Sequence, residues 1–350
     1  MTIAVLLPAV TALLALVFAI ALLDQWRERR RSFQIVWAIG MLFFAIASGS
    51  EAVGALGGWS ESVYRTWYVT GAVATAAWLG LGSALLLART RFGYAYGALV
   101  VLGGIAAFFI ARRYPDVGSV PLLVLIGALI LGAAIVIETY FQNERWPAIA
   151  AIGVIALTIV AASLAFVGPL NGPLPAQADI PSGAAMPGTA RALSFVLNIS
   201  GGLALVLGAL FSVYIFMPKR RVLDYSLDPD QPAEHVAFNA ILAIVAIPVN
   251  FIASLPGALA ALATGRIHSR VPATLLIGIG GLVATSVDLL SRLGSTELFQ
   301  VGKFISVVLI FLGFLVSIEV FREIHIPFTG RVLRANRNER VATATSDSTN

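Results

Sequence analysis

Long apolar runs separated by short polar segments make up most of the chain. A helix needs about 20 residues to cross the 30 Å hydrocarbon core of a bilayer, and these runs have that length. They are too long and too evenly apolar for the alternating strands of a membrane barrel. We therefore predict nine helical spans, near residues 2–23, 33–57, 64–88, 93–111, 119–141, 147–168, 192–217, 271–294 and 296–321.

The segment 236–264 does not fit this pattern, because proline and polar residues interrupt it near its middle. Pro248 and Pro256 each remove a helical hydrogen bond, and Asn250 lies between them. Two halves of about 12 residues would each rise about 18 Å, which is enough to enter a membrane but not to cross it. We expect a broken or re-entrant segment within an all-α polytopic transmembrane helix bundle. The alternative is one long, kinked tenth crossing.

Positive charge at the ends of the runs predicts how the chain is threaded. Loops that face the cytoplasm carry an excess of Lys and Arg. With the N-terminus outside, the inside loops carry Arg27, Arg29, Arg30, Arg31, Arg89, Arg91, Arg145, Lys219, Arg220 and Arg221. The outside loops carry only Arg65, Arg112, Arg113 and Arg191. The bias favours an outside N-terminus, and a re-entrant 236–264 puts the basic C-terminus in the cytoplasm.

The chain is expected to form one transmembrane domain, residues 1–321, followed by a tail. Residues 169–191 are rich in Pro, Gly and Ala and predict an extracytoplasmic loop that folds over the bundle. Residues 218–235 predict a cytoplasmic loop. The tail, 322–350, is first basic and then rich in Ser and Thr, which is typical of a partly disordered cytoplasmic segment.

Composition narrows the function classes. Hydrophobic residues make up 59% of the chain and charged residues 12%, and the mean hydropathy is +0.90. The absence of cysteine excludes disulfides, thiolate metal sites and cysteine nucleophiles. The three histidines have no partner at metal-ligand spacing, and no HExxH, GxSxG or phosphate-loop motif is present. We therefore expect no metal, no cofactor, no nucleic-acid partner and no enzyme activity.

Ionisable residues inside membrane spans are costly, so each is a candidate for function. Glu51 and Asp288 lie near the outer ends of their spans, and Arg292 follows Asp288 by four residues, on the same helix face. Arg65 opens the third span and is the expected partner of Glu51. With Asn250 of the interrupted segment, these residues predict a binding site for a polar or zwitterionic ligand in the outer leaflet.

Aromatic and basic residues at the same depth have a simpler interpretation. Trp59 and Trp67 belong to the type that anchors helices at the headgroup region, and Lys303 can extend its ammonium toward water. For these three residues we favour anchoring over ligand binding. For Glu51 and Asp288 the two interpretations stay open, because a carboxylate cannot reach far.

Part of the chain resembles a group of bacterial multi-pass membrane proteins of unknown function. The resemblance lies between Trp37 and Leu87, at Trp37, Gly40, Glu51, Gly58, Trp59, Tyr64, Arg65, Tyr68, Gly71, Ala72, Trp78, Leu79, Gly80 and Gly82. The stretches 292–294 and 313–315 look similar to the close of the same proteins. The resemblance implies a bacterial plasma membrane and no particular activity, and it favours Glu51 and Arg65 as a pair.

Two functions remain as hypotheses. The first is non-enzymatic binding or passage of a small solute or lipid through the outer-leaflet cluster and the interrupted segment. The second is a membrane-embedded sensor or accessory subunit, because the chain has almost no soluble domain and any output must pass to a membrane protein partner. The lipid bilayer is the expected surrounding in both.

Overall fold

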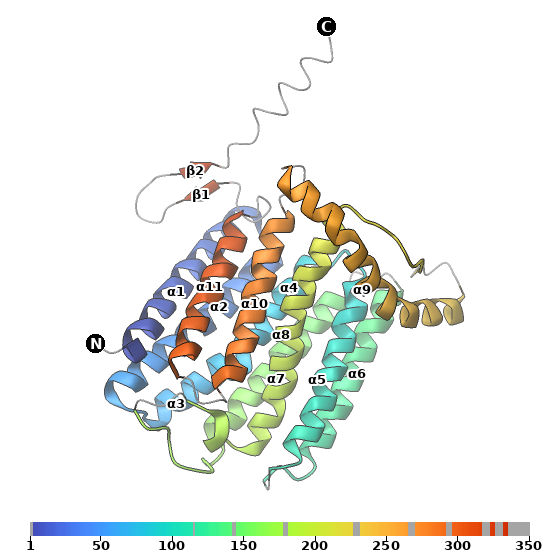
Figure 1. The fold of residues 1–350 in the computed structure, drawn as a ribbon. Helices are drawn as coiled ribbons and strands as arrows, with labels where there is room; N and C mark the ends of the chain where they lie inside the picture. The colour runs from blue at the N-terminus through green and yellow to red at the C-terminus, as the bar shows by residue number, and fades with distance from the viewer. Residues whose placement is uncertain are drawn as a thin grey trace.

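Helices account for nearly all of the folded chain in the computed structural model (Figure 1). The structure describes residues 3–114, 116–141, 145–177, 181–226, 232–264, 270–291, 296–316, 323–325 and 332–334. The first six helical elements are α1 (Ile3–Arg29), α2 (Ser32–Gly57), α3 (Glu61–Trp67), the π-helix η1 (Tyr68–Thr75), α4 (Ala76–Leu86) and α5 (Phe92–Ala111). They are followed by α6 (Val120–Tyr140), α7 (Trp146–Val167), the short 3₁₀ turn η2 (Gly183–Ala185), α8 (Gly188–Phe216), α9 (Ala233–Ala263), α10 (Arg270–Ser291) and α11 (Thr296–Val316).

Nine helices of the described chain are long and apolar enough to cross a membrane. The chain is therefore a polytopic, all-α integral membrane protein, as the apolar runs predicted. By length and composition these nine include α9, while α10 has a shorter apolar stretch, Val271–Ser286. In space α10 packs against α8 and α11, whereas α9 runs obliquely to the bundle near its upper end (Figure 1).

The third span is one continuous rod built from α3, η1 and α4. Its middle, Tyr68–Thr75, is wound as a π-helix, whose wider turn bonds residue i to i+5. The Thr75 hydroxyl donates to the Thr70 carbonyl at 2.7 Å, which satisfies a carbonyl of this widened turn. The Thr70 hydroxyl bonds in turn to the Thr66 carbonyl at 2.7 Å. Side-chain hydroxyls thus supply hydrogen bonds to a helix segment of unusual geometry inside the membrane.

Glycines allow α4 and α8 to approach with their backbones in contact. A methyl group built on Gly80 would overlap the backbone of Gly201, and one built on Gly201 would overlap the carbonyl of Ala76. Close backbone contact of this kind is how helices associate in lipid, where no hydrophobic force drives them together. The crossing makes α8 the central helix, which also contacts α5, α7 and α10.

Two large apolar clusters fill the bundle on either side of this crossing. One joins the third span to α5, α6, α7 and α8 through residues such as Leu81 and Phe92. The other joins α1, α2, α10 and α11 around the fully buried Phe18, Trp37 and Phe314. The Trp37 indole also donates to the Leu79 carbonyl at 3.1 Å, which fastens α2 to α4.

The segment 236–264 differs from the broken hairpin that its prolines predicted. Ala233–Ala263 is a single uninterrupted helix with Pro248 and Pro256 inside it, and it changes direction along its length (Figure 1). Ala258 packs with Tyr214 near the end of α8 and with Val271 near the start of α10. Helix α9 therefore begins and ends at the same end of the bundle, as the hairpin would have done, but without a break.

The segment between α7 and α8 folds back over the lower end of the bundle. Helix α8 begins at Gly188, so the last residues of the predicted 169–191 loop are helical. The Gln177 amide donates to the carbonyls of Ala55 and Leu56 at 3.1 and 2.8 Å, which ties the loop to the end of α2. Beyond α11 the structure describes two short antiparallel strands, β1 (Glu323–His325) and β2 (Val332–Arg334); the rest of the predicted disordered tail lies outside the described residues.

The α4–α8 crossing gives a prediction with a neighbouring control. We expect Gly201→Ala to lower the free energy of unfolding by about 1–3 kcal/mol, because the added methyl must displace the α4 backbone. Gly202→Ala adds the same methyl where no atom lies within 4 Å, and it should be neutral or slightly stabilising. Thermal unfolding of both variants in detergent tests this. Equal melting temperatures would contradict the packing.

Candidate functional site

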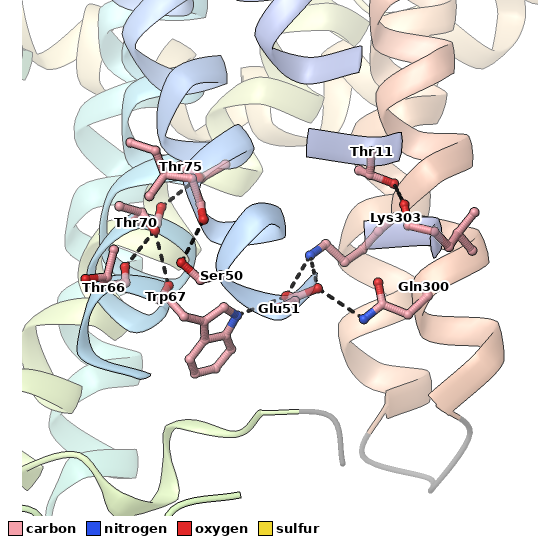
Figure 2. Close-up of polar contacts among 11 residues, drawn as sticks. Thr11, Ser50, Glu51, Thr66, Trp67, Thr70, Thr75, Gln300 and Lys303 are labelled. Carbon is pink, nitrogen blue, oxygen red and sulfur yellow. Dashed lines mark hydrogen bonds and ion pairs between the residues drawn. The ribbon is translucent and has the colours of Figure 1, made fainter. Parts of the chain in front are cut away.

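Glu51 lies at the centre of a buried polar network between α2, α3 and α11 (Figure 2). Only 3% of its side chain is exposed. The Lys303 ammonium donates to both carboxylate oxygens at 2.8 Å, and the Gln300 amide donates to one of them at 3.1 Å. The Trp67 indole donates to the other oxygen at 2.9 Å. Three side chains from two other helices thus surround one carboxylate.

Helical geometry explains why Glu51 and Lys303 meet. Glu51 precedes the end of α2 by six residues and Lys303 follows the start of α11 by seven, so both lie about 10 Å from that end of the bundle. Gln300 and Lys303 are three residues apart and share one face of α11. Side chains at equal depth on facing helices can form an ion pair that neither helix could satisfy alone.

Two aromatic rings lie near the Lys303 ammonium, in addition to the Glu51 carboxylate. The ammonium lies 5.3 Å from the ring centre of Phe44 on α2 and 5.3 Å from that of Phe299 on α11. The faces of aromatic rings attract cations. The lysine side chain is 13% exposed, against 3% for the glutamate, so Lys303 is the more exposed member of the pair.

Four aromatic side chains form a wall beside Glu51. Tyr64 and Trp67 stack with ring centres 5.7 Å apart, and Trp59 meets Trp67 edge-on at 6.1 Å. Trp67 also touches Tyr68, the first residue of the π-helix. Within the described structure the buried Trp59 indole nitrogen has no hydrogen-bond partner. Trp59 and Trp67 were predicted to be interfacial anchors, but the Trp67 indole donates a hydrogen bond to the Glu51 carboxylate.

The predicted Glu51–Arg65 pair does not form. Arg65 is buried and donates to Glu61 at 2.8 Å, to the Ala165 carbonyl, and to the Gly168 carbonyl at 2.9 Å. These two carbonyls end α7, where helical partners are missing and the helix dipole is negative. Arg65 therefore caps α7 from α3. Arg65 precedes Trp67, the α3 residue that donates to Glu51, by two positions, so it projects from a different side of the helix.

A second polar contact, centred on Asp116, holds the same end of the bundle together. Its carboxylate accepts hydrogen bonds from the Asn171 amide at 2.9 Å and from the Gly188 amide, the first of α8, at 2.8 Å. Desolvation alone would raise the pKa of Asp116, but these bonds and the charge of Arg191 outweigh it and hold the pKa below its ordinary value. Asp116 thus caps α8 and joins the α5–α6 loop to the 169–187 segment.

Asn250, another predicted site residue, does not join the Glu51 network. Asp288 falls within α10, but its side chain lies outside the described part, as does Arg292. Asn250 is fully buried and bonds to the backbone of Val222 and Leu223 through its oxygen and to the Leu223 carbonyl through its nitrogen, at 2.7 to 2.9 Å. All of these bonds hold the chain between α8 and α9, so Asn250 has a structural role.

Sequence reasoning missed Lys303 and Gln300 as partners of Glu51. Lys303 was assigned to interfacial anchoring, and Gln300 was not considered. One signal was present, because Gln300, Lys303 and Ser306 recur at every third position of the apolar run after Leu298. Comparing the depth of each charge along its helix would have shown that Lys303 lies at the level of Glu51.

A shallow groove of about 350 Å³ lies on another face of α2. It runs between α2 and α3 and is lined by Ile46, Gly49, Ser50, Val53, Ser62, Val63 and Thr66. Successive helical residues turn by 100°, so this face points away from Glu51. The groove is therefore separate from the ion pair. Among the described residues, no three His, Asp or Glu side chains are grouped as a metal site would require.

Comparisons with known proteins found no match: no protein-family model, no curated protein and no solved structure matches this chain. The family resemblance noted in the sequence therefore remains an expectation. What the structure establishes is a multi-pass helical membrane protein with a buried carboxylate–ammonium pair.

The buried pair predicts strong coupling between its members. Lys303→Met leaves the Glu51 carboxylate buried without a cation and should cost about 3–5 kcal/mol of stability. In the double variant Glu51→Gln/Lys303→Met the new amide oxygen can accept from Trp67 and its NH2 group can donate to the Gln300 amide oxygen after that amide turns over, so most of that loss should be recovered. Thermal unfolding of the wild type, both single variants and the double variant measures the coupling. Additive losses would show that the two side chains do not form a pair.

Proposed function

We propose that the protein is a non-enzymatic membrane receptor. It binds a small polar or zwitterionic solute or a lipid headgroup, and Glu51 and Lys303 form the binding site. The observation that carries this proposal is the burial of the full Glu51 network about 10 Å inside one end of the bundle. A buried ion pair contributes little net stability compared with apolar residues of the same size. Its presence in a membrane bundle therefore favours a binding role over a purely structural one.

The surroundings of the pair support binding of a ligand with both charges. The carboxylate and the ammonium lie side by side, so a zwitterion can contact both without leaving a net charge behind. Trp59 adds a buried indole donor that has no partner in the described structure. The segment 169–187 lies over the same end and bonds Tyr64 through the Ser182 carbonyl. Such a cover favours a site that is screened from bulk water.

The proposal includes an orientation. Basic residues gather at the upper end of Figure 1, where the chain turns between α1 and α2, α4 and α5, and α8 and α9. The positive-inside rule makes that end cytoplasmic. With the bacterial plasma membrane implied by the sequence resemblance, the Glu51 site then opens toward the periplasmic side, and both termini follow the threading expected from the sequence.

A second candidate function, an accessory subunit of a larger membrane complex, is favoured by the outer face of α9. Phe238 and Ile241 are each 67% exposed and Ile252 is 64% exposed, whereas Ala246 on the opposite face is buried. A broad exposed apolar face is typical of a surface that a lipid or another helix covers. Co-purification of a stoichiometric membrane protein from mild detergent would favour this candidate over the first.

Ligand binding can be tested with defined probes. Purified protein in detergent should gain thermal stability from at least one of glycine, phosphoethanolamine and phosphocholine, and Glu51→Gln should abolish that gain, because the acceptor loses its charge. Ser50→Ala is a matched control, since the Ser50 hydroxyl bonds only to the Ile46 carbonyl of its own helix. If no probe shifts the melting temperature, or if Glu51→Gln responds like the wild type, the proposed function is wrong.

The orientation can be tested by labelling, because the chain contains no cysteine. Gly172→Cys in the α7–α8 segment and Pro218→Cys after α8 are both exposed positions at opposite ends of the bundle. A membrane-impermeant maleimide applied to intact cells should label the first and spare the second, which should react only after the cells are opened. The reverse pattern would place the Glu51 site on the cytoplasmic side.

A further inference from the structure

The Lys303 ammonium is held in the way that proteins hold a bound amine. Both Glu51 oxygens accept from it at 2.8 Å, and the ring centres of Phe44 and Phe299 each lie 5.3 Å from it. A carboxylate combined with aromatic faces is a common arrangement for recognising ammonium groups. Here the occupant is a side chain of the protein itself.

The two halves of the pair differ in how easily they can separate. Glu51 has a short side chain, is 3% exposed, and keeps hydrogen bonds from Trp67 and Gln300. Lys303 is 13% exposed and ends a flexible four-carbon stem that can extend toward the nearby aqueous end. The ammonium can therefore leave while the carboxylate stays in place with two of its donors.

We propose that Lys303 occupies an ammonium site and yields it to a zwitterionic ligand with a primary ammonium and an anionic group. This rests on the proposed function and specifies its ligand. The ligand ammonium takes the place of Nζ beside Glu51, and the released Lys303 pairs with the ligand's phosphate or carboxylate. The chemistry is that of an aminophospholipid headgroup or a free amino acid or amino phosphate.

Charge balance decides between a zwitterion and a simple cation. The buried pair has one charge of each sign, and a ligand with an ammonium and an anionic group offers a partner to each, so the exchange makes two new ion pairs. A lone amine that displaced Lys303 would add a second ammonium to the site and bring no anionic group to pair with the released one. A primary ammonium is favoured over a quaternary one because the Glu51 oxygens accept N–H donors, which a quaternary group lacks.

Chemical rescue tests the ammonium site directly. Lys303→Ala removes the ammonium and leaves Glu51, Phe44 and Phe299 in place. Ethylamine at neutral pH should restore at least half of the lost melting temperature, whereas ethanol and tetramethylammonium should not. The double variant Glu51→Gln/Lys303→Ala is the matched control and should gain nothing from ethylamine, since the acceptor charge is gone.

A wild-type measurement keeps the test decisive if Lys303→Ala does not fold. Phosphoethanolamine should stabilise the wild type at a concentration at least 10-fold lower than phosphocholine, ethanolamine or inorganic phosphate. Vesicles of phosphatidylethanolamine against phosphatidylglycerol then distinguish a lipid headgroup from a free solute. Equal responses to phosphoethanolamine and phosphocholine, or rescue by ethanol as good as by ethylamine, would overturn this inference and leave the proposed binding function standing. No response to any zwitterion would overturn both.

Discussion

A carboxylate inside a helical membrane bundle must have a cation and hydrogen-bond donors at its own depth, because neither lipid nor an apolar side chain can solvate it. In this protein Glu51 receives these from Lys303, Gln300 and Trp67. The requirement links α2 to α11 and to the third span. It therefore joins helices that are far apart in sequence.

The third span contributes to this site through its unusual winding. Trp67, the last residue of α3, donates to Glu51, and the π-helix begins at the next residue. A π-helical turn is wider than an α-helical one and is often found beside functional sites. Farther along, Gly80 allows the same rod to lie against the α8 backbone. The third span thus packs closely against α8 at its α4 end. At its α3 end the Trp67 indole donates to Glu51 of the ion pair.

Polar side chains elsewhere at the bundle ends mostly satisfy the backbone. Arg65 bonds the last carbonyls of α7, Asp116 bonds the first amide of α8, and Asn250 holds the segment before α9. Helix ends leave backbone groups without helical partners, and in a membrane protein these must be satisfied within the chain or by water. Arg65 and Asn250, which are ligand candidates in the sequence, therefore satisfy backbone groups at helix ends, whereas Glu51 does not.

The sequence by itself determined the class of protein, nearly all the spans and the candidacy of Glu51, because span length and the cost of a buried charge are local properties. It did not determine which residue pairs with Glu51, since the partner depends on which helices face each other and on how deep each side chain lies in the bundle. Nor did it decide between a broken segment and the one continuous α9 that contains Pro248 and Pro256. Only the tertiary structure decided these points, because residues distant in sequence supply the missing partners in space.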